Sequence, residues 1–168
     1  MRQAIVLLAL LAGTGSAQWQ RFGARPPANA PASLSRDMLA LHNAARAGLR
    51  IPPLVWSKQL AARSQTWADT LLSRRRFEHS PNSPYGENLF EIIGAAASPA
   101  QVVQSWTDES RHYDYRANTC TTGECGHYTQ IVWRDTKAVG CAVARDRGRE
   151  VWVCTYDPPG NWVGARPY

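Results

Sequence analysis

The chain has 168 residues, a net charge of +6 and a hydrophobic content of 44%. Its length suits one domain able to bury about 70% of its unfolded surface. No run of apolar residues in the sequence approaches the roughly 20 that a membrane helix needs. The positive charge is mostly arginine spread along the chain, which argues against nucleic acid as a partner and leaves transient contact with an anionic membrane surface or cell wall open.

The first 33 residues are expected to lie outside the folded domain. Arg2 is followed by an apolar stretch at residues 4–12 and by small residues at 15–17, a pattern typical of an export signal. Residues 1–17 are therefore predicted to be a signal peptide, and the protein to be secreted into the extracellular space. Residues 18–33 are rich in proline and alanine, which predicts a flexible lead-in to a domain at 34–168.

Two helices are expected at the start of the domain. From Ser35, apolar residues recur at helical spacing until Pro52. A second periodic pattern follows Ser57 and ends at the basic run that begins with Arg74. This run fits the end of a helix, where cations complement the negative end of the helix dipole.

The third expected helix has the clearest start signal in the chain. Ser98 can cap the helix, Pro99 suits its first position, and Gln101 can complete a capping box. The segment before it, residues 89–97, is apolar and contains a glycine, which indicates a loop. The helix is therefore predicted to begin at Pro99.

After Cys125 the apolar period falls towards two, which indicates strands. Residues 127–133, 138–144 and 150–156 are predicted strands, and a turn at residues 146–148 is expected to join the last two. Helices followed by strands predict an α+β layered domain.

The chain has four cysteines, Cys120, Cys125, Cys141 and Cys154. In an exported chain they are expected to form two disulfides rather than a thiol catalyst. Three pairings are allowed by the sequence. A zinc site made of cysteines is the alternative, but the chain has no CxxC spacing.

Three motifs, taken in order, carry a family resemblance. They are Tyr-Gly-Glu-Asn-Leu at 85–89, Gly-His-Tyr-Thr-Gln-Ile-Val-Trp at 126–133, and the segment 153–162 around Cys154. Together they resemble the CAP superfamily of secreted proteins, which includes cysteine-rich secretory, antigen 5 and pathogenesis-related proteins, and specifically its fungal-type secreted members. The resemblance runs from about Leu34 to Tyr168. It implies a disulfide-stabilised three-layer α–β–α sandwich with the pairs Cys120–Cys125 and Cys141–Cys154.

The resemblance also implies a site of two histidines and two glutamates. The matching residues are His79, Glu87, Glu109 and His127, separated by 8, 22 and 18 residues, so no local spacing rule groups them. Two neutral imidazoles can bind zinc or another divalent metal, and the carboxylates can join them or hydrogen-bond to the rings. Taken singly, each residue also fits an ordinary structural role. As a set in their motifs, they predict a shared cleft.

Three classes of function remain open. The fungal-type resemblance implies binding of sterols or fatty acids, with Phe90, Ile92 and Ile93 as candidate lipid contacts; alternatively, this segment only packs on the domain. The familiar hydrolase signatures GxSxG and HExxH are absent from the sequence, which favours a binding protein over a metal-dependent hydrolase or protease. The third class is a secreted protein that acts on a receptor or surface without catalysis. A monomer is expected.

The resembled family often has a further disulfide. Its two positions are occupied here by Arg75 and Asp146. Their opposite charges predict an ion pair in place of the missing bond.

Overall fold

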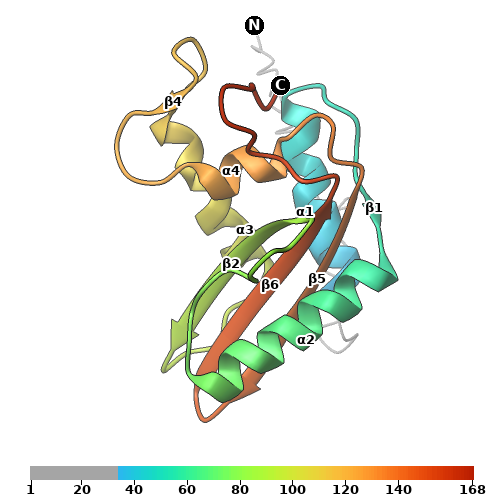
Figure 1. Ribbon diagram of the computed structural model, residues 1–168, viewed down its shortest axis with the longest axis vertical. Coiled ribbons are helices and arrows are strands. Elements are labelled where there is room, and N and C mark those ends of the chain that lie inside the picture. Colours follow the sequence, from blue (N-terminus) through green and yellow to red (C-terminus); the bar gives the residue numbers. More distant parts are fainter. Residues whose placement is uncertain (1–33) are drawn as a thin grey trace, which may run out of the picture. The chain divides into compact units, whose positions relative to one another are not determined.

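The computed structural model describes residues 34–168 (Figure 1), and the predicted signal peptide and lead-in lie outside this range. The elements follow in this order: α1 (Leu34–Gly48), β1 (Val55–Trp56), α2 (Lys58–Arg74), β2 (Gly86–Ile93), α3 (Pro99–Thr107), the 3-10 helix η1 (Asp108–His112), β3 (Tyr113–Asp114), β4 (Thr119–Cys120), α4 (Gly126–Ile131), β5 (Ala138–Asp146) and β6 (Arg149–Asp157). No helix in this part of the chain is long and apolar enough to cross a bilayer.

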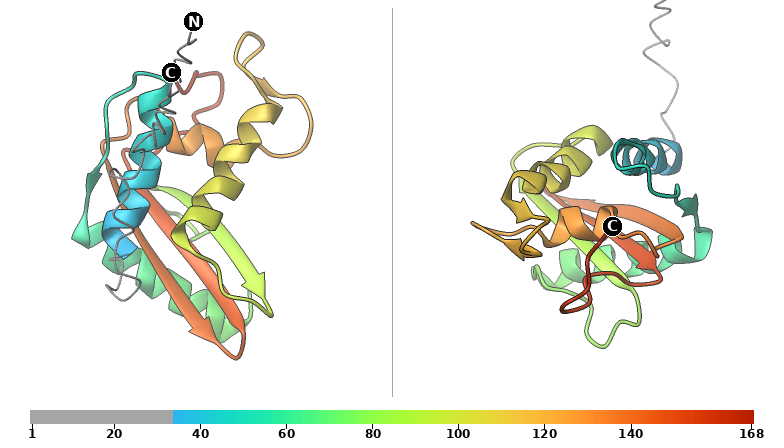
Figure 2. Two further views of the ribbon diagram at one scale, coloured as in Figure 1. Left: turned by 180° about the vertical axis from the view of Figure 1, so that it is seen from behind. Right: turned by 90° about the horizontal axis from the view of Figure 1, so that it is seen from above.

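The central sheet has the strand order β1-β5-β6-β2. β6 pairs antiparallel with both β5 and β2, whereas the short β1 pairs parallel with β5. α2 covers one face of the sheet, and α1 and α3 cover the other (Figures 1 and 2). The predicted α–β–α sandwich is confirmed.

Each face of the sheet has its own apolar core. On the α2 face, Ala68 and Leu71 pack with Val151 and Val153. On the other face the larger cluster includes Trp152 of β6 and four residues of α1 and α3: Met38, Val102, Val103 and Trp106. Successive residues of β6 serve opposite cores because side chains alternate along a strand.

The predicted helix starts and the final hairpin are confirmed. The Ser57 side chain accepts a hydrogen bond from the Leu60 amide at 3.2 Å, and the capping box of Ser98 and Gln101 is complete. Arg147 and Gly148, both at positive φ, form the two-residue turn between β5 and β6.

Both implied disulfides, Cys120–Cys125 and Cys141–Cys154, are present, and the described residues include no free cysteine. The cysteine–zinc alternative is therefore excluded. Cys141 and Cys154 are directly paired in the ladder between β5 and β6.

Two buried polar residues of α1 connect it to distant segments. His42 Nδ1 donates to the Met38 carbonyl at 2.7 Å, so its Nε2 accepts from the Tyr156 hydroxyl at 2.8 Å. Arg46 donates to five backbone carbonyls, those of Pro52, Ile131, Trp133, Arg134 and Thr136. Burial lowers the pKa of His42 to about 4 and that of Arg46 to about 10.

The predicted strand at 127–133 is wrong, because residues 126–131 form the helix α4. Four successive residues of this helix are buried: Tyr128, Thr129, Gln130 and Ile131. The segment therefore lacks the exposed polar face by which an amphipathic helix is identified in a sequence. A short segment buried on every side cannot be assigned to a helix or a strand from periodicity alone.

The predicted loop at 89–97 is also partly wrong, because β2 extends to Ile93 and pairs with β6 along its whole length. Phe90 and Ile92 are half-buried against the larger core, which agrees with the packing alternative. Ile93, at the end of this edge strand, is 72% exposed.

The ion pair predicted between Arg75 and Asp146 is wrong. In the described part of the chain, Asp146 pairs with Arg147, its neighbour in the hairpin turn, with Oδ2 and Nε 3.9 Å apart. Arg75 and Asp146 nevertheless line the same surface hollow.

Candidate functional site

A cleft of about 410 Å³ lies where the start of β2, the start of α4 and the loop closed by Cys120–Cys125 meet. It is lined by His79, Glu87, Asn88, Cys120, Gly123, Glu124, Cys125, Gly126, His127 and Asn161. Three of the four predicted site residues are thus on its wall. The fourth, Glu109, contacts His127 from η1.

His79 and Glu87 form the first imidazole–carboxylate pair. His79 Nδ1 and Glu87 Oε1 are 2.8 Å apart, and the Ser80 amide donates to the same oxygen at 3.0 Å. The Glu87 side chain is 8% exposed whereas that of His79 is 66% exposed, so the carboxylate is fixed and the ring faces solvent. The hydrogen bond to Glu87 raises the pKa of His79, although burial partly opposes this shift.

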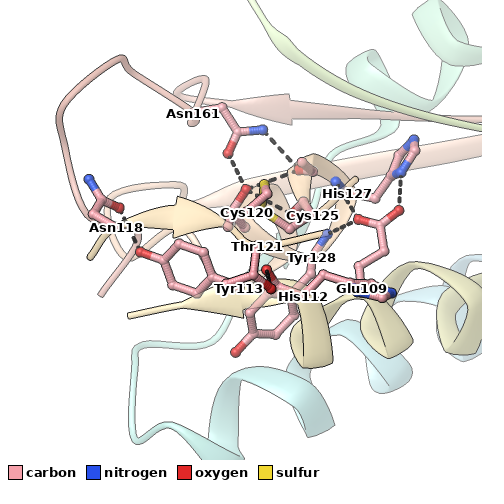
Figure 3. The surroundings of a disulfide bond; sticks show 12 residues. Glu109, His112, Tyr113, Asn118, Cys120, Thr121, Cys125, His127, Tyr128 and Asn161 are labelled. Atoms are coloured by element: carbon pink, nitrogen blue, oxygen red, sulfur yellow. Dashed lines mark hydrogen bonds and ion pairs between the residues drawn. A yellow bond between two sulfur atoms is a disulfide. The ribbon is translucent and has the colours of Figure 1, made fainter. Parts of the chain in front are cut away.

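His127 and Glu109 form the second pair, which is visible in Figure 3. His127 Nδ1 lies 2.6 Å from Glu109 Oε1, while the amides of His127 and Tyr128 donate to Oε2 at 3.0 and 3.1 Å. Glu109 therefore caps the first turn of α4, where backbone N–H groups have no helical partner. Burial opposes ionisation of Glu109, but these hydrogen bonds outweigh it and lower the pKa of the carboxyl. Trp106 stacks on the His127 ring, with centroids 6.1 Å apart.

The two pairs share one arrangement. In each, a carboxylate holds Nδ1, and Nε2 has no hydrogen-bond partner among residues 34–168. Metal-binding histidines in proteins have this form, in which a carboxylate fixes the tautomer and the orientation of the ring. The donor set of the cleft therefore fits a divalent metal such as zinc.

Glu124 is a site residue that the sequence reasoning missed. Glu109, Glu124 and His127 each offer a ligand atom, and these atoms all lie within 4.8 Å of one another. Glu124 lines the same cleft as His79, and its charge contributes to raising the pKa of that histidine. His79 itself is not among the residues whose ligand atoms lie this close together. The available sequence signal was a carboxylate inside a disulfide-closed loop three residues before His127.

Two asparagines hold the backbone of the cleft in place. Asn88 Nδ2 donates to the His127 carbonyl at 3.0 Å, and Asn161 Nδ2 donates to the Gly126 carbonyl at 2.9 Å. Thr129 in turn donates to Asn161 Oδ1 at 2.7 Å. These contacts fix the first turn of α4, and with it His127, against β2 and the C-terminal segment.

A second hollow of about 360 Å³ adjoins the cleft and shares Cys120, Cys125, Gly126 and Asn161 with it. Its other lining residues include Tyr113, Trp133, Trp162 and Val163. Trp162 is 63% exposed. An apolar surface thus lies beside the polar cleft, at residues that the sequence reasoning did not select.

Comparison with known proteins matches residues 39–156 to the Cysteine-rich secretory protein family, CAP. The chain is 46% identical over 135 residues to pathogenesis-related protein 1A of Nicotiana tabacum, covering 79% of this chain and 80% of the relative. It is 42% identical over 134 residues to pathogenesis-related protein 1 of Arabidopsis thaliana, covering 79% and 81%. These relatives are plant proteins, and the expected fungal-type subgroup is not supported.

Solved structures show the same fold. Venom allergen-like protein 4 of Schistosoma mansoni aligns with a TM-score of 0.66 and 24% identity, covering 81% of this chain and 94% of the other. A crystal structure of NaASP2 with Zn²⁺ aligns with a TM-score of 0.65 and 21% identity, covering 84% and 88%. The family match, the plant relatives and the shared fold agree: the chain belongs to the CAP family of cysteine-rich secretory proteins, where it resembles pathogenesis-related proteins of type 1.

Proposed function

We propose that this protein is a secreted, non-catalytic binding protein whose cleft holds a divalent cation through His79 and His127. The observation that carries the proposal is the pair of Nδ1–carboxylate contacts at 2.8 and 2.6 Å, which leave both Nε2 atoms available. A zinc ion bound there would supply a Lewis-acidic anchor for a polar group of a ligand. The structure of NaASP2 with Zn²⁺ shows that a protein of this fold can be crystallised with this metal.

The residues of the cleft have distinct roles in this proposal. His79 and His127 are the ligands, Glu87 and Glu109 orient their rings, and Glu124 adds a carboxylate. Among the described residues that line the cleft there is no serine, threonine or free cysteine, so no nucleophile of these types faces it. This counts against a hydrolase that uses a side-chain nucleophile, whereas the metal-dependent alternative, which would use a metal-bound water, is decided by the turnover assay below.

Calorimetry with zinc on the protein purified from culture medium tests the metal site. The wild type should bind zinc, and the double variant His79→Ala/His127→Ala should not. His112→Ala is the matched control, because His112 bonds to Thr122 and lines no part of the cleft. Equal binding by the wild type and the double variant would remove these histidines as ligands. Zinc-dependent turnover of a peptide or ester, lost in the double variant, would instead establish the hydrolase alternative.

We further propose that the cleft and the adjoining hollow together bind an amphiphilic ligand such as a sterol or fatty acid. The polar end of the ligand would lie in the cleft, and its apolar part would lie against Trp133 and Trp162. This replaces Phe90 and Ile92 as contacts, because both pack against the core. The exposed Trp162 beside a polar site is the observation that favours this second role.

Titration with radiolabelled sterol and fatty acid tests the amphiphile. Trp162→Ala should weaken saturable binding, because it removes the largest exposed apolar contact of the hollow. Val55→Thr is the control, since Val55 is also an exposed apolar residue but lines neither the cleft nor the hollow. Absence of saturable binding by the wild type would refute this role for those lipids.

A further inference from the structure

A surface rich in arginine lies at the end of the sheet away from the cleft. The end of α2, the end of β2 and the β5–β6 turn meet there, as Figure 1 shows, and the Arg149 side chain donates to the Arg76 carbonyl at 2.8 Å across this junction. We call this surface the arginine tip and define it by Arg74, Arg75, Phe77, Ile93 and Arg147. A hollow of about 410 Å³, lined by the last four of these residues, lies within it.

The tip has positive charge that its own acids do not match. Arg149 is paired with Glu91, and Arg76 with Glu78 at 3.5 Å. Asp146 is the remaining acid and lies 3.9 Å from Arg147. Within residues 34–168, neither Arg74 nor Arg75 forms an ion pair, so two guanidinium groups remain available to an external anion.

Apolar side chains are exposed beside these cations. Ile93 is 72% exposed and Phe77 48% exposed, and both line the hollow together with Arg75 and Arg147. A single exposed apolar residue needs no explanation. Two exposed apolar residues within a cationic surface make the tip amphipathic. Because both side chains are largely exposed, packing of the domain does not account for them.

We propose that the arginine tip docks the protein on anionic lipid surfaces, with Arg74 and Arg75 contacting headgroup phosphates and Phe77 and Ile93 entering the interface. Guanidinium groups bind phosphate oxygens through paired hydrogen bonds. An anionic polysaccharide would also attract the arginines, but it would leave the apolar pair without a role. Lipid is therefore the occupant that accounts for both features.

This surface is separate from the proposed metal cleft. Glu87 and Ile93 lie on the same strand, and six residue steps at about 3.3 Å place them about 20 Å apart. Variants of the tip are thus expected to leave zinc binding intact, so the two proposals can fail independently.

Co-sedimentation with phosphatidylcholine vesicles, with and without phosphatidylglycerol, tests the docking. The protein is purified from culture medium and its N-terminus is determined by mass spectrometry, so that residues 1–17 do not contribute. Binding should require phosphatidylglycerol and weaken as salt is added, because salt screens exposed charges. No binding to the anionic vesicles would overturn the proposal.

The decisive comparison is between two variants that each remove two positive charges. Arg74→Gln/Arg75→Gln should weaken partitioning roughly 30-fold, since each cation near an anionic surface contributes roughly fivefold. Lys58→Gln/Lys137→Gln should retain nearly all binding, because these lysines lie at the start of α2 and just before β5, the opposite end of both elements. An equal loss in both variants would show a general charge effect and overturn the tip as the site.

The apolar half of the proposal has its own test. Ile93→Thr keeps a β-branched residue on the edge strand and should weaken vesicle binding several-fold without changing the salt dependence. If this variant binds vesicles as the wild type does, and polygalacturonate binds as tightly as phosphatidylglycerol vesicles, the tip is an anion surface and not a lipid-docking one.

Discussion

Glu109 both orients His127 and caps the first turn of α4. Its two oxygens contact one imidazole and two backbone amides, so the position of the helix and that of the ring depend on the same carboxylate. Glu124, in contrast, is exposed and has no structural contact of this kind in the described chain. Glu109 thus has a structural role in the fold, whereas the carboxylate of Glu124 has no role other than that of a metal ligand in the proposed site.

We predict that Glu124→Gln lowers the zinc affinity about tenfold. This is the lower end of the loss of metal affinity, roughly 10- to 100-fold, that follows removal of a residue supporting the metal ligands. The change keeps the size of the side chain and removes its charge beside His127 and His79. Asp69→Asn on α2 is the control for net charge, because Asp69 lines no part of the cleft. Calorimetry separates the outcomes: a wild type that does not bind zinc refutes the metal site, and equal binding by wild type and Glu124→Gln refutes the role of Glu124 alone.

His42 predicts a loss of stability in mild acid. Burial lowers its pKa from 6.5 to about 4, so the unfolded chain takes up this proton first, and the stabilisation present above pH 6.5 is lost as the pH falls towards 4. At about 1.4 kcal/mol per pKa unit, the loss between pH 7 and pH 4.5 is roughly 2 to 3 kcal/mol. The pKa of His79 is raised, so the pH dependence of its smaller stabilising contribution is opposite. This contribution is present below pH 6.5 and is lost as the pH rises through the raised pKa.

Urea unfolding at a series of pH values measures this effect. His42→Gln removes the titrating group, so its free energy of unfolding should change less between pH 7 and pH 4.5, whatever its value at pH 7. Glu109 and Glu150, whose pKa values are lowered from 4.5, lose their stabilising effect mainly below this range. The same pH slope in both proteins would show that His42 does not control the transition.

At the scale of elements, the helices with local start signals could be predicted and the elements without them could not. Ser57 and Ser98 carry their caps in the sequence, and the β5–β6 turn carries its glycine. α4 has no such signal: its segment is rich in β-prone residues, and contacts with Glu109 and Arg46, far away in the sequence, hold it as a helix. β2 was missed in part because its apolar residues include both core contacts and an exposed end.

Arg46 is the strongest single link between elements, and we predict that Arg46→Met destabilises the protein by more than about 3 kcal/mol. The substitution leaves five carbonyls without this donor, four of them at residues 131–136, from the end of α4 to just before β5. An unsatisfied buried group costs roughly 1–3 kcal/mol. Arg46→Lys should recover only part of the loss, since an ammonium cannot reach carbonyls in a planar fork. Urea unfolding measures both, with the exposed Arg63→Met as control; a loss below 1 kcal/mol for Arg46→Met would contradict this account.

At the scale of the whole molecule, the site is assembled from four separate segments. His79 follows α2, Glu87 begins β2, Glu109 lies in η1 and His127 begins α4, so only the fold brings them together. The family resemblance could identify these four residues, because it carries the fold with it. It could not identify Glu124 or the hollow at Trp162, which depend on how this particular loop and C-terminal segment pack.

The two disulfides should therefore have different consequences when removed. Cys141–Cys154 joins two buried strands 13 residues apart in sequence, and the loop-entropy relation gives roughly 3 kcal/mol for its loss, expected without a change in the cleft. Cys120–Cys125 closes a loop of separation 5, for which the same relation gives about 2 kcal/mol. This loop, however, carries Glu124 and borders both the cleft and the hollow at Trp162.

We predict that Cys120→Ser/Cys125→Ser weakens zinc binding. Cys141→Ala/Cys154→Ala, measured under conditions where it remains folded, should not weaken it. Calorimetry and urea unfolding on both double variants decide the matter: unchanged zinc affinity after opening the Cys120–Cys125 loop would show that the disulfide does not position the cleft.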